Sequence, residues 1–224
     1  SVLKEKTCKS GINFENFYKK SMRDSDYYKF AKEDIDYAIK HSWTYQEFIK
    51  KLKENLSDDY LVFTTKEPSN SEFGNYVKKN ENCLHGMTYA YLIAADRCYH
   101  LEKYIEPALN TNDIVISDRY IESSLVLQKY DGVTIEDIWR LNCKFRIPDL
   151  SIILLSEEKN LEDRLNEREK LSYFESKITR YEEIEGYVEA ATFLKNKGFN
   201  IVLLNNNTQK DLYGNINIIE RMIV

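Results

Sequence analysis

The sequence predicts an α/β protein whose parallel sheet is flanked by helices and preceded by a helical segment. From residue 60 onward, short apolar runs alternate with long, charged, amphipathic stretches, which is the pattern of a chain that alternates strands and helices. Only 7 glycines and 3 prolines occur in 224 residues, which argues against a turn-rich all-β fold and against disorder. With 42% hydrophobic residues, the chain is long enough to bury one large core.

The first part of the chain is predicted to be helical. Ile35 and Ile39 belong to an apolar stripe within a charged stretch, and Thr44-Tyr-Gln-Glu47 has the spacing of a capping box that begins a second helix. We therefore divide the chain into a helical segment, residues 1–55, and an α/β domain, residues 56–224.

Four apolar runs predict the strands of the sheet. They are Tyr60–Thr64, Asp113–Ser117, Leu150–Leu155 and Asn200–Leu204. Periodic segments between the strands predict helices over Met87–Leu109, from Thr134 to about Asn142, from Glu158 to about Arg168, and over Tyr181–Lys195.

Charged side chains follow the predicted strand ends, where open α/β sheets place their ligands. Asp118, Arg119 and Tyr120 come directly after the second strand, and Lys66-Glu67-Pro68 comes after the first. Arginine can hold phosphate through two hydrogen bonds, and aspartate can orient a metal-bound water. A salt-bridged loop explains Asp118–Tyr120 about equally well, and a plain surface turn explains Lys66–Pro68 better when that segment is taken alone.

Further basic residues lie within predicted helices. Arg97 either reaches solvent or turns inward to bind a base. Arg164, Arg168 and Lys170 form a basic cluster, for which a solvated helix face is the ordinary explanation.

Composition excludes several other classes. The formal charge of -5 argues against a dedicated surface for nucleic acid. No apolar run approaches the roughly 18 residues that span a bilayer, so we expect no membrane association and a cytoplasmic location. The 4 cysteines are far apart in the sequence, which favours reduced thiols over disulfides or a zinc site.

In this order, the segments from about residue 48 to the C-terminus resemble thymidylate kinase. The matching motifs are Thr65-Lys-Glu-Pro68, Ala94-Ala-Asp-Arg-Cys-Tyr-His100, Ile116-Ser-Asp-Arg-Tyr-Ile-Glu-Ser-Ser-Leu125 with Gln128, and Pro148-Asp-Leu-Ser-Ile152. The resemblance implies the fold of the P-loop nucleoside monophosphate kinases. It also implies transfer of the γ-phosphoryl group from ATP to dTMP, giving dTDP, with Mg²⁺ as cofactor, and a homodimer formed through the helices around Tyr89–Tyr104.

The resemblance assigns roles to individual residues. Glu67 and Arg119 would act near the acceptor phosphate and the metal, supported by Asp118, which would hold Mg²⁺ through a water. Arg97 would read the edge of the thymine. The remaining expected site residues are Gln128 as a second base or sugar contact, Tyr120 and Pro68 in the pocket wall, and Arg164 and Arg168 in a lid that neutralises the transferring phosphoryl group.

One motif of this family is absent from the 224 residues. No Gly-x-x-x-x-Gly-Lys-Ser/Thr sequence occurs, although in the family this phosphate-binding loop follows a first strand at the centre of the sheet. We expect the helical segment to replace that strand and its loop, between the strands at Asp113 and Leu150. The consequences expected are impaired use of ATP and unpaired edges on the flanking strands.

Residues 9–50 resemble a helical segment of plasmid mobilisation relaxases, but the three histidines lack the metal-binding spacing of those enzymes, so no nickase is implied. Three hypotheses remain open. The chain is a thymidylate kinase-like enzyme of impaired activity, a non-catalytic nucleotide-binding protein or recombinant fusion product, or a helical accessory protein for nucleic acid. The acidic charge makes the last of these the least favoured.

Overall fold

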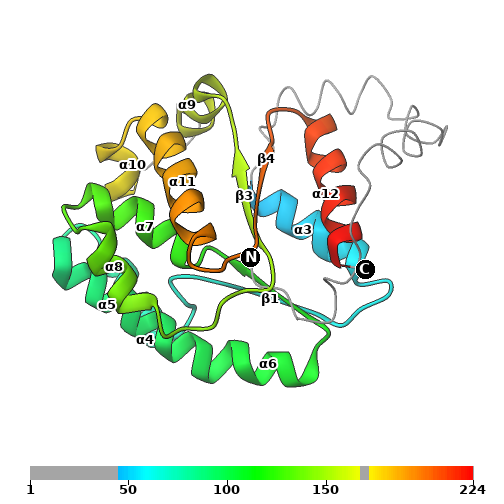
Figure 1. The fold of residues 1–224 in the computed structure, drawn as a ribbon, viewed down its shortest axis with the longest axis horizontal. Coiled ribbons are helices and arrows are strands. Elements are labelled where there is room, and N and C mark those ends of the chain that lie inside the picture. The colour runs from blue at the N-terminus through cyan, green and yellow to red at the C-terminus, as the bar shows by residue number, and fades with distance from the viewer. Residues whose placement is uncertain (1–44, 167–171, 224) are drawn as a thin grey trace.

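A computed structural model describes residues 45–166 and 172–223 of the chain. Most of the predicted helical segment, and with it most of the relaxase-like region, lies outside these residues, so both stay predictions. The described part is an α/β fold in which parallel strands are flanked by helices, as the sequence predicts (Figure 1). Within it, no helix is long and apolar enough to cross a membrane.

The four strands form two separate parallel pairs. β1 (Val62–Lys66) pairs with β2 (Ile114–Asp118), and β3 (Ser151–Leu155) pairs with β4 (Ile201–Asn205). Each strand begins one or two residues later than predicted. At the first pair the reason is visible, because Leu61 N–H donates to the Asp113 carboxylate and Leu61 C=O accepts from Asp113 N–H, so both residues close the end of the sheet.

No strand of the described ranges pairs with the remaining edge of β2 or of β3. The two pairs nevertheless share their cores. Ile114 and Ile116 pack in one cluster with Leu150, while Val115 packs with Ile153 in another on the opposite face. Because helices on both faces connect the pairs, β1-β2 and β3-β4 belong to one layer that lacks a strand between them in the described chain.

The described helices are α3 (Tyr45–Leu56), α4 (Glu72–Lys79), α5 (Gly86–His100), η3 (Leu101–Ile105), α6 (Glu106–Thr111), α7 (Ile121–Tyr130), α8 (Ile135–Asn142), α9 (Glu158–Asn166), α10 (Tyr173–Lys177), α11 (Arg180–Lys195) and α12 (Gln209–Ile223). Of these, η3 is a five-residue π-helical turn. Helices α4, α7, α10 and α12 were not predicted from the sequence. The helix expected over Met87–Leu109 is interrupted, because Pro107 has no N–H and its ring conflicts with a regular preceding turn, which widens into η3.

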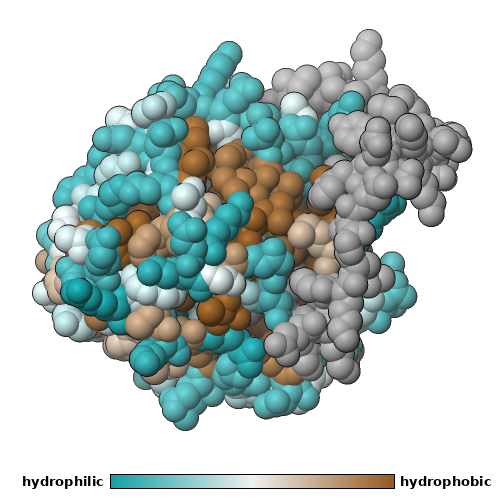
Figure 2. Space-filling view, in the orientation of Figure 1, coloured by the Kyte–Doolittle hydropathy of each residue, from teal (hydrophilic) through white to brown (hydrophobic). Residues whose placement is uncertain are grey.

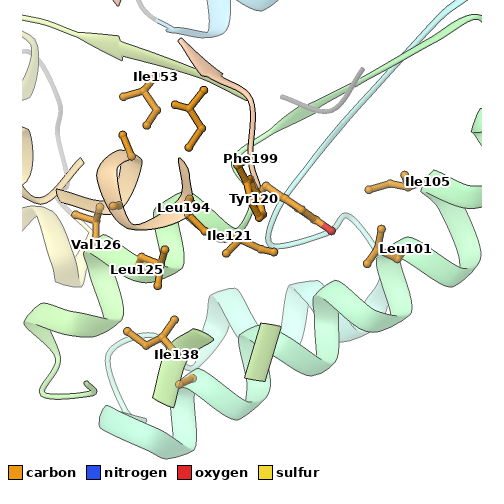
Figure 3. Packing of buried hydrophobic residues seen from close by; sticks show 14 of the residues in the cluster. Leu101, Ile105, Tyr120, Ile121, Leu125, Val126, Ile138, Ile153, Leu194 and Phe199 are labelled. Atoms are coloured by element: carbon orange, nitrogen blue, oxygen red, sulfur yellow. The ribbon is translucent and has the colours of Figure 1, made fainter. Parts of the chain in front are cut away.

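Two helix layers cover the strands. On one face, α3 and α12 bury a cluster that includes Phe48, Leu52 and Leu212. On the other, α5 to α8 and α11 surround Tyr120, Leu125 and Leu194 (Figure 3). Figure 2 shows hydrophobic surface in the middle of the viewed face, where Figure 1 places β3 and β4, so the described helices cover these strands only in part.

Candidate functional site

A cavity of about 440 Å³ lies beyond the carboxyl ends of β1 and β2. This volume falls in the range of small-molecule sites. The residues that follow β1 and β2, together with helices α4, α5, α7, α10 and α11, contribute to its wall. The expected site residues that line it together are Glu67, Pro68, Arg97, Arg119, Tyr120 and Gln128. The structure thus gathers residues that are up to 61 positions apart in the sequence, from Glu67 to Gln128.

Arg97 is the most deeply buried cation in the cavity wall, with 2% of its side chain exposed. Its Nε donates to Glu67 Oε2 at 2.8 Å, Nη2 donates to Ser124 Oγ at 2.9 Å, and Nη1 donates to Asn142 Oδ1. The guanidinium also lies 5.2 Å from the centroid of the Tyr120 ring. These bonds use three of the five N–H groups of an arginine, and they fix the plane of the guanidinium before any ligand arrives.

Gln128 lies on α7 at the same end of the cavity. It is 3% exposed, its Nε2 donates to Ser124 Oγ at 3.4 Å, and its Oε1 has no hydrogen-bond partner among the described residues. A buried carbonyl oxygen without a hydrogen-bond partner costs free energy, so this oxygen would gain from an N–H donor.

Arg119 connects the first cavity to a second one of about 210 Å³. Its backbone has φ 68°, in the left-handed region that non-glycine residues rarely adopt, and Ser117 Oγ donates to its carbonyl at 2.9 Å. Side chains at the ends of β2 and β3 line the second cavity, together with Phe48 and Ile49 of α3.

Asp118 lines this second cavity rather than the first. Burial raises the pKa of its carboxyl group, and the positive charges of Arg119 and Lys66 only partly offset this effect. Glu122 lies nearby, 7% exposed, and its Oε1 has no partner in the described part of the chain. The side chains of Asp118 and Glu67 thus line different cavities, although Glu67 N–H donates to Asp118 C=O at 2.9 Å.

Sequence reasoning missed Lys78, a half-buried cation on α4 that also lines the first cavity. Its Nζ donates to Ser69 C=O at 2.8 Å and to Asn70 Oδ1 at 3.3 Å. Burial lowers the pKa of Lys78, and repulsion from Lys66 adds to this. The N-cap at Ser71 was the available signal, because it begins a helix whose second turn places Lys78 beside the loop.

The loop between β1 and α4 is held by buried polar groups. Asp96 accepts from Ser69 N–H at 2.7 Å and from Ser69 Oγ at 2.6 Å, and the Glu67–Pro68 peptide bond is cis. The two hydrogen bonds to Asp96 anchor the loop against α5, next to Glu67.

Short helix α10 closes the side of the cavity. Phe174 is 8% exposed and lies 6.0 Å from Tyr89, measured between ring centroids, while Tyr173 donates to Asp131 Oδ1 at 3.0 Å. Arg164 belongs to α9, and Arg168 lies outside the described residues. The role of these two arginines in a lid therefore stays a prediction.

No group of three or more His, Cys, Asp or Glu side chains in the described ranges is arranged to hold a metal ion. A lone carboxylate such as Asp118 still suits Mg²⁺, which keeps several of its waters and uses few protein ligands.

Comparison with known proteins identifies the family of the chain. The thymidylate kinase family model matches residues 25–211. A probable thymidylate kinase of Caldivirga maquilingensis is 41% identical over 120 residues, covering 52% of this chain and 58% of that protein. The thymidylate kinase of Staphylococcus haemolyticus is 38% identical over 152 residues, covering 62% of this chain and 73% of that protein.

A solved thymidylate kinase from Ehrlichia chaffeensis has the same fold, with a TM-score of 0.60 and 21% sequence identity over 80% of this chain and 91% of that chain. The chain thus spans less than two thirds of the Caldivirga relative and nearly all of the fold in this structure. The family match over most of the sequence leads to one conclusion: the chain belongs to the thymidylate kinase family.

Proposed function

We propose that the chain binds dTMP in the cavity of about 440 Å³ and transfers the γ-phosphoryl group of ATP to it, giving dTDP. The observation that supports this most strongly is that one cavity combines cations with a buried, unpaired amide oxygen. An anionic nucleotide with an N–H group on its base needs both.

Lys78 and Arg119 would bind the phosphate of dTMP. Both line the cavity, and Lys78 Nζ bonds only to neutral oxygens in the contacts described, so its charge is available to an anion. Arg119 lies where the two cavities meet, beside the point at which a second phosphate group would be transferred.

Gln128 and Arg97 would recognise the base. Thymine presents N3–H between two carbonyl oxygens, so Gln128 Oε1 can accept from N3–H while a remaining N–H of Arg97 donates to a carbonyl. Cytosine has an acceptor at N3 and would leave Gln128 Oε1 unpaired. Gln128 and Arg97 would therefore favour binding of dTMP over dCMP.

In the reaction, an oxygen of the dTMP phosphate attacks Pγ of ATP, and the bond from Pγ to the β–γ bridging oxygen breaks, releasing ADP. Arg119 would offset the negative charge on the transferring group, and Asp118 would hold Mg²⁺ through a water. Bound Mg²⁺ would neutralise charge on the ATP phosphates.

The part of the site that would bind ATP, the phosphoryl donor, supports a second candidate function. The 224 residues contain no Gly-x-x-x-x-Gly-Lys-Ser/Thr loop, and no described strand lies between β2 and β3, where the second cavity is found. We therefore propose that turnover is impaired, with a non-catalytic nucleotide-binding protein as the alternative.

A coupled assay that follows ADP release from ATP, Mg²⁺ and dTMP tests the catalytic proposal. Turnover that depends on dTMP and exceeds that with dCMP would support it. A rate equal to that without enzyme, in folded protein that still binds dTMP, would leave the binding protein as the function. Tight binding of Mg²⁺-ATP would contradict that alternative.

The homodimer implied by the resemblance is also a proposal. Tyr91 and Tyr99 of α5 and Tyr104 of η3 are exposed large aromatic side chains, which are enriched in protein interfaces. Analytical ultracentrifugation should show a dimer, and a monomer at micromolar concentration would contradict it.

A further inference from the structure

His100 is a buried titratable residue that lies behind the cavity rather than in its wall. It is the last residue of α5, 1% of it is exposed, and it does not line either cavity. Its imidazole contacts two polar groups, and one of these belongs to the site.

Both ring nitrogens have a polar partner, and Glu67 requires a donor at Nδ1. His100 Nδ1 lies 3.3 Å from Glu67 Oε1, and Nε2 lies 2.6 Å from Thr65 Oγ1. An ionised carboxylate only accepts hydrogen bonds, so Nδ1 must donate to Glu67, while the threonine hydroxyl is able to donate to Nε2. A neutral imidazole with its proton on Nδ1 therefore satisfies both partners.

Glu67 transmits this contact into the site. Its Oε1 accepts from His100, and its Oε2 accepts from Arg97 Nε at 2.8 Å. Without the bond from His100, one oxygen of a carboxylate that is 5% exposed would lose a partner, and the carboxylate would be able to rotate about its last torsion. Rotation would tilt the guanidinium of Arg97, because Glu67 sets the position of its Nε.

We propose that His100 is a positioning residue of the nucleotide site, which acts through Glu67 to orient Arg97 toward the base. This inference rests on the proposed binding of dTMP. It assigns a function to a buried histidine that an ordinary packing role would otherwise explain.

Two substitutions separate orientation from packing. The amide nitrogen of Asn in His100→Asn can occupy the place of Nδ1 and still donate to Glu67. The amide of Gln in His100→Gln reaches the place of Nε2, near Thr65, and gives no donor to Glu67. Glutamine is closer to histidine in volume, so a packing role predicts that H100Q is the milder change, whereas the positioning role predicts that H100N is.

Calorimetry with dTMP, with inorganic phosphate as the second ligand, tests this in the full chain. We expect H100Q to weaken dTMP binding about tenfold, H100N to stay within about threefold of wild type, and phosphate binding to be unchanged in both. Thermal unfolding identifies variants that fail to fold, and Thr65→Val measures the contact at Nε2 separately.

Failure of the proposed function and failure of this inference are distinguishable. Wild type that does not bind dTMP overturns the function. Wild type that binds dTMP, with H100Q binding equally well, overturns the positioning role alone. The NMR signal of Arg97 Nε–H, recorded without ligand, should move in H100Q and stay in place in H100N; an unchanged signal in H100Q would also overturn the inference.

Discussion

Replacing Lys78 with methionine removes one cation from the cavity wall and keeps most of the length of the side chain. Lys78 is half-buried and lies on α4, where its Nζ donates to Ser69 C=O at 2.8 Å. If Lys78 binds the phosphate of dTMP, the substitution should weaken binding of dTMP and leave binding of thymidine, which has no phosphate, unchanged.

The size of the effect follows from the surroundings of Lys78. Two unit charges at 4 Å attract by about 4 kcal/mol at an effective dielectric constant of 20, but removing them from water cancels much of this. A hydrogen bond to a charged group contributes about 1.5–3 kcal/mol net, and partial exposure favours the lower end. We therefore expect dTMP affinity to fall about tenfold, with a loss of stability below about 1 kcal/mol from the bond to Ser69.

Calorimetric titration of wild type and K78M with dTMP and with thymidine provides the measurement. Lys79→Met is a matched control, because Lys79 is the next residue of the same helix, is exposed and does not line the cavity. Equal losses in K78M and K79M, or an equal loss for thymidine, would refute the role of Lys78 in phosphate binding.

Three further predictions concern stability. Burial raises the pKa of Asp118 above its ordinary value of 3.8, so ionisation of this carboxyl group destabilises the folded state. Asp118→Asn should therefore raise Tm at pH 7, and the gain should vanish below about pH 4, where the carboxyl group is protonated in both the folded and the unfolded chain. Equal Tm values for wild type and D118N at pH 7 would contradict this. A Cβ on Gly74 would lie 2.2 Å from the Ser69 carbonyl oxygen, so Gly74→Ala should lower the free energy of unfolding in urea by about 3 kcal/mol. Gly214→Ala is the control: a Cβ there has no heavy atom within 4 Å, so this substitution should not be destabilising. Tyr120→Phe removes a hydroxyl that donates to the Arg146 carbonyl at 2.9 Å. It should lower the free energy of unfolding by about 1 kcal/mol in the same assay, and a change near zero would argue against that hydrogen bond.

The strands could be predicted because they are apolar runs with polar or charged residues at their ends. All four occur within two residues of the expected positions. The helices were harder to predict, because α7 follows Tyr120 directly and buries residues such as Glu122 and Gln128, which hides its apolar face in the sequence. The interruption of the helix at η3 depends on how Pro107 fits against the preceding turn. The periodicity of apolar residues in the sequence does not predict this fit.

The candidate site could be predicted in part. Arg97, Arg119 and Gln128 were found through family motifs, and the structure places all three around one cavity. Lys78 and His100 were missed because their roles depend on tertiary contacts, with the loop after β1 in one case and with Glu67 in the other. The same dependence explains why Asp118 lines only the second cavity, whereas its neighbour Arg119 lines both: successive residues at a strand end point to different sides.

We propose that the chain forms a dTMP site even though the 224 residues lack the phosphate-binding loop of the family. Calorimetric titration of the full chain with dTMP, in the absence of ATP, tests it most directly. We expect saturable binding at one site per chain, weaker for dCMP and weakened by K78M. Folded protein that gives no saturable heat with dTMP, or that binds dCMP equally well, would contradict it.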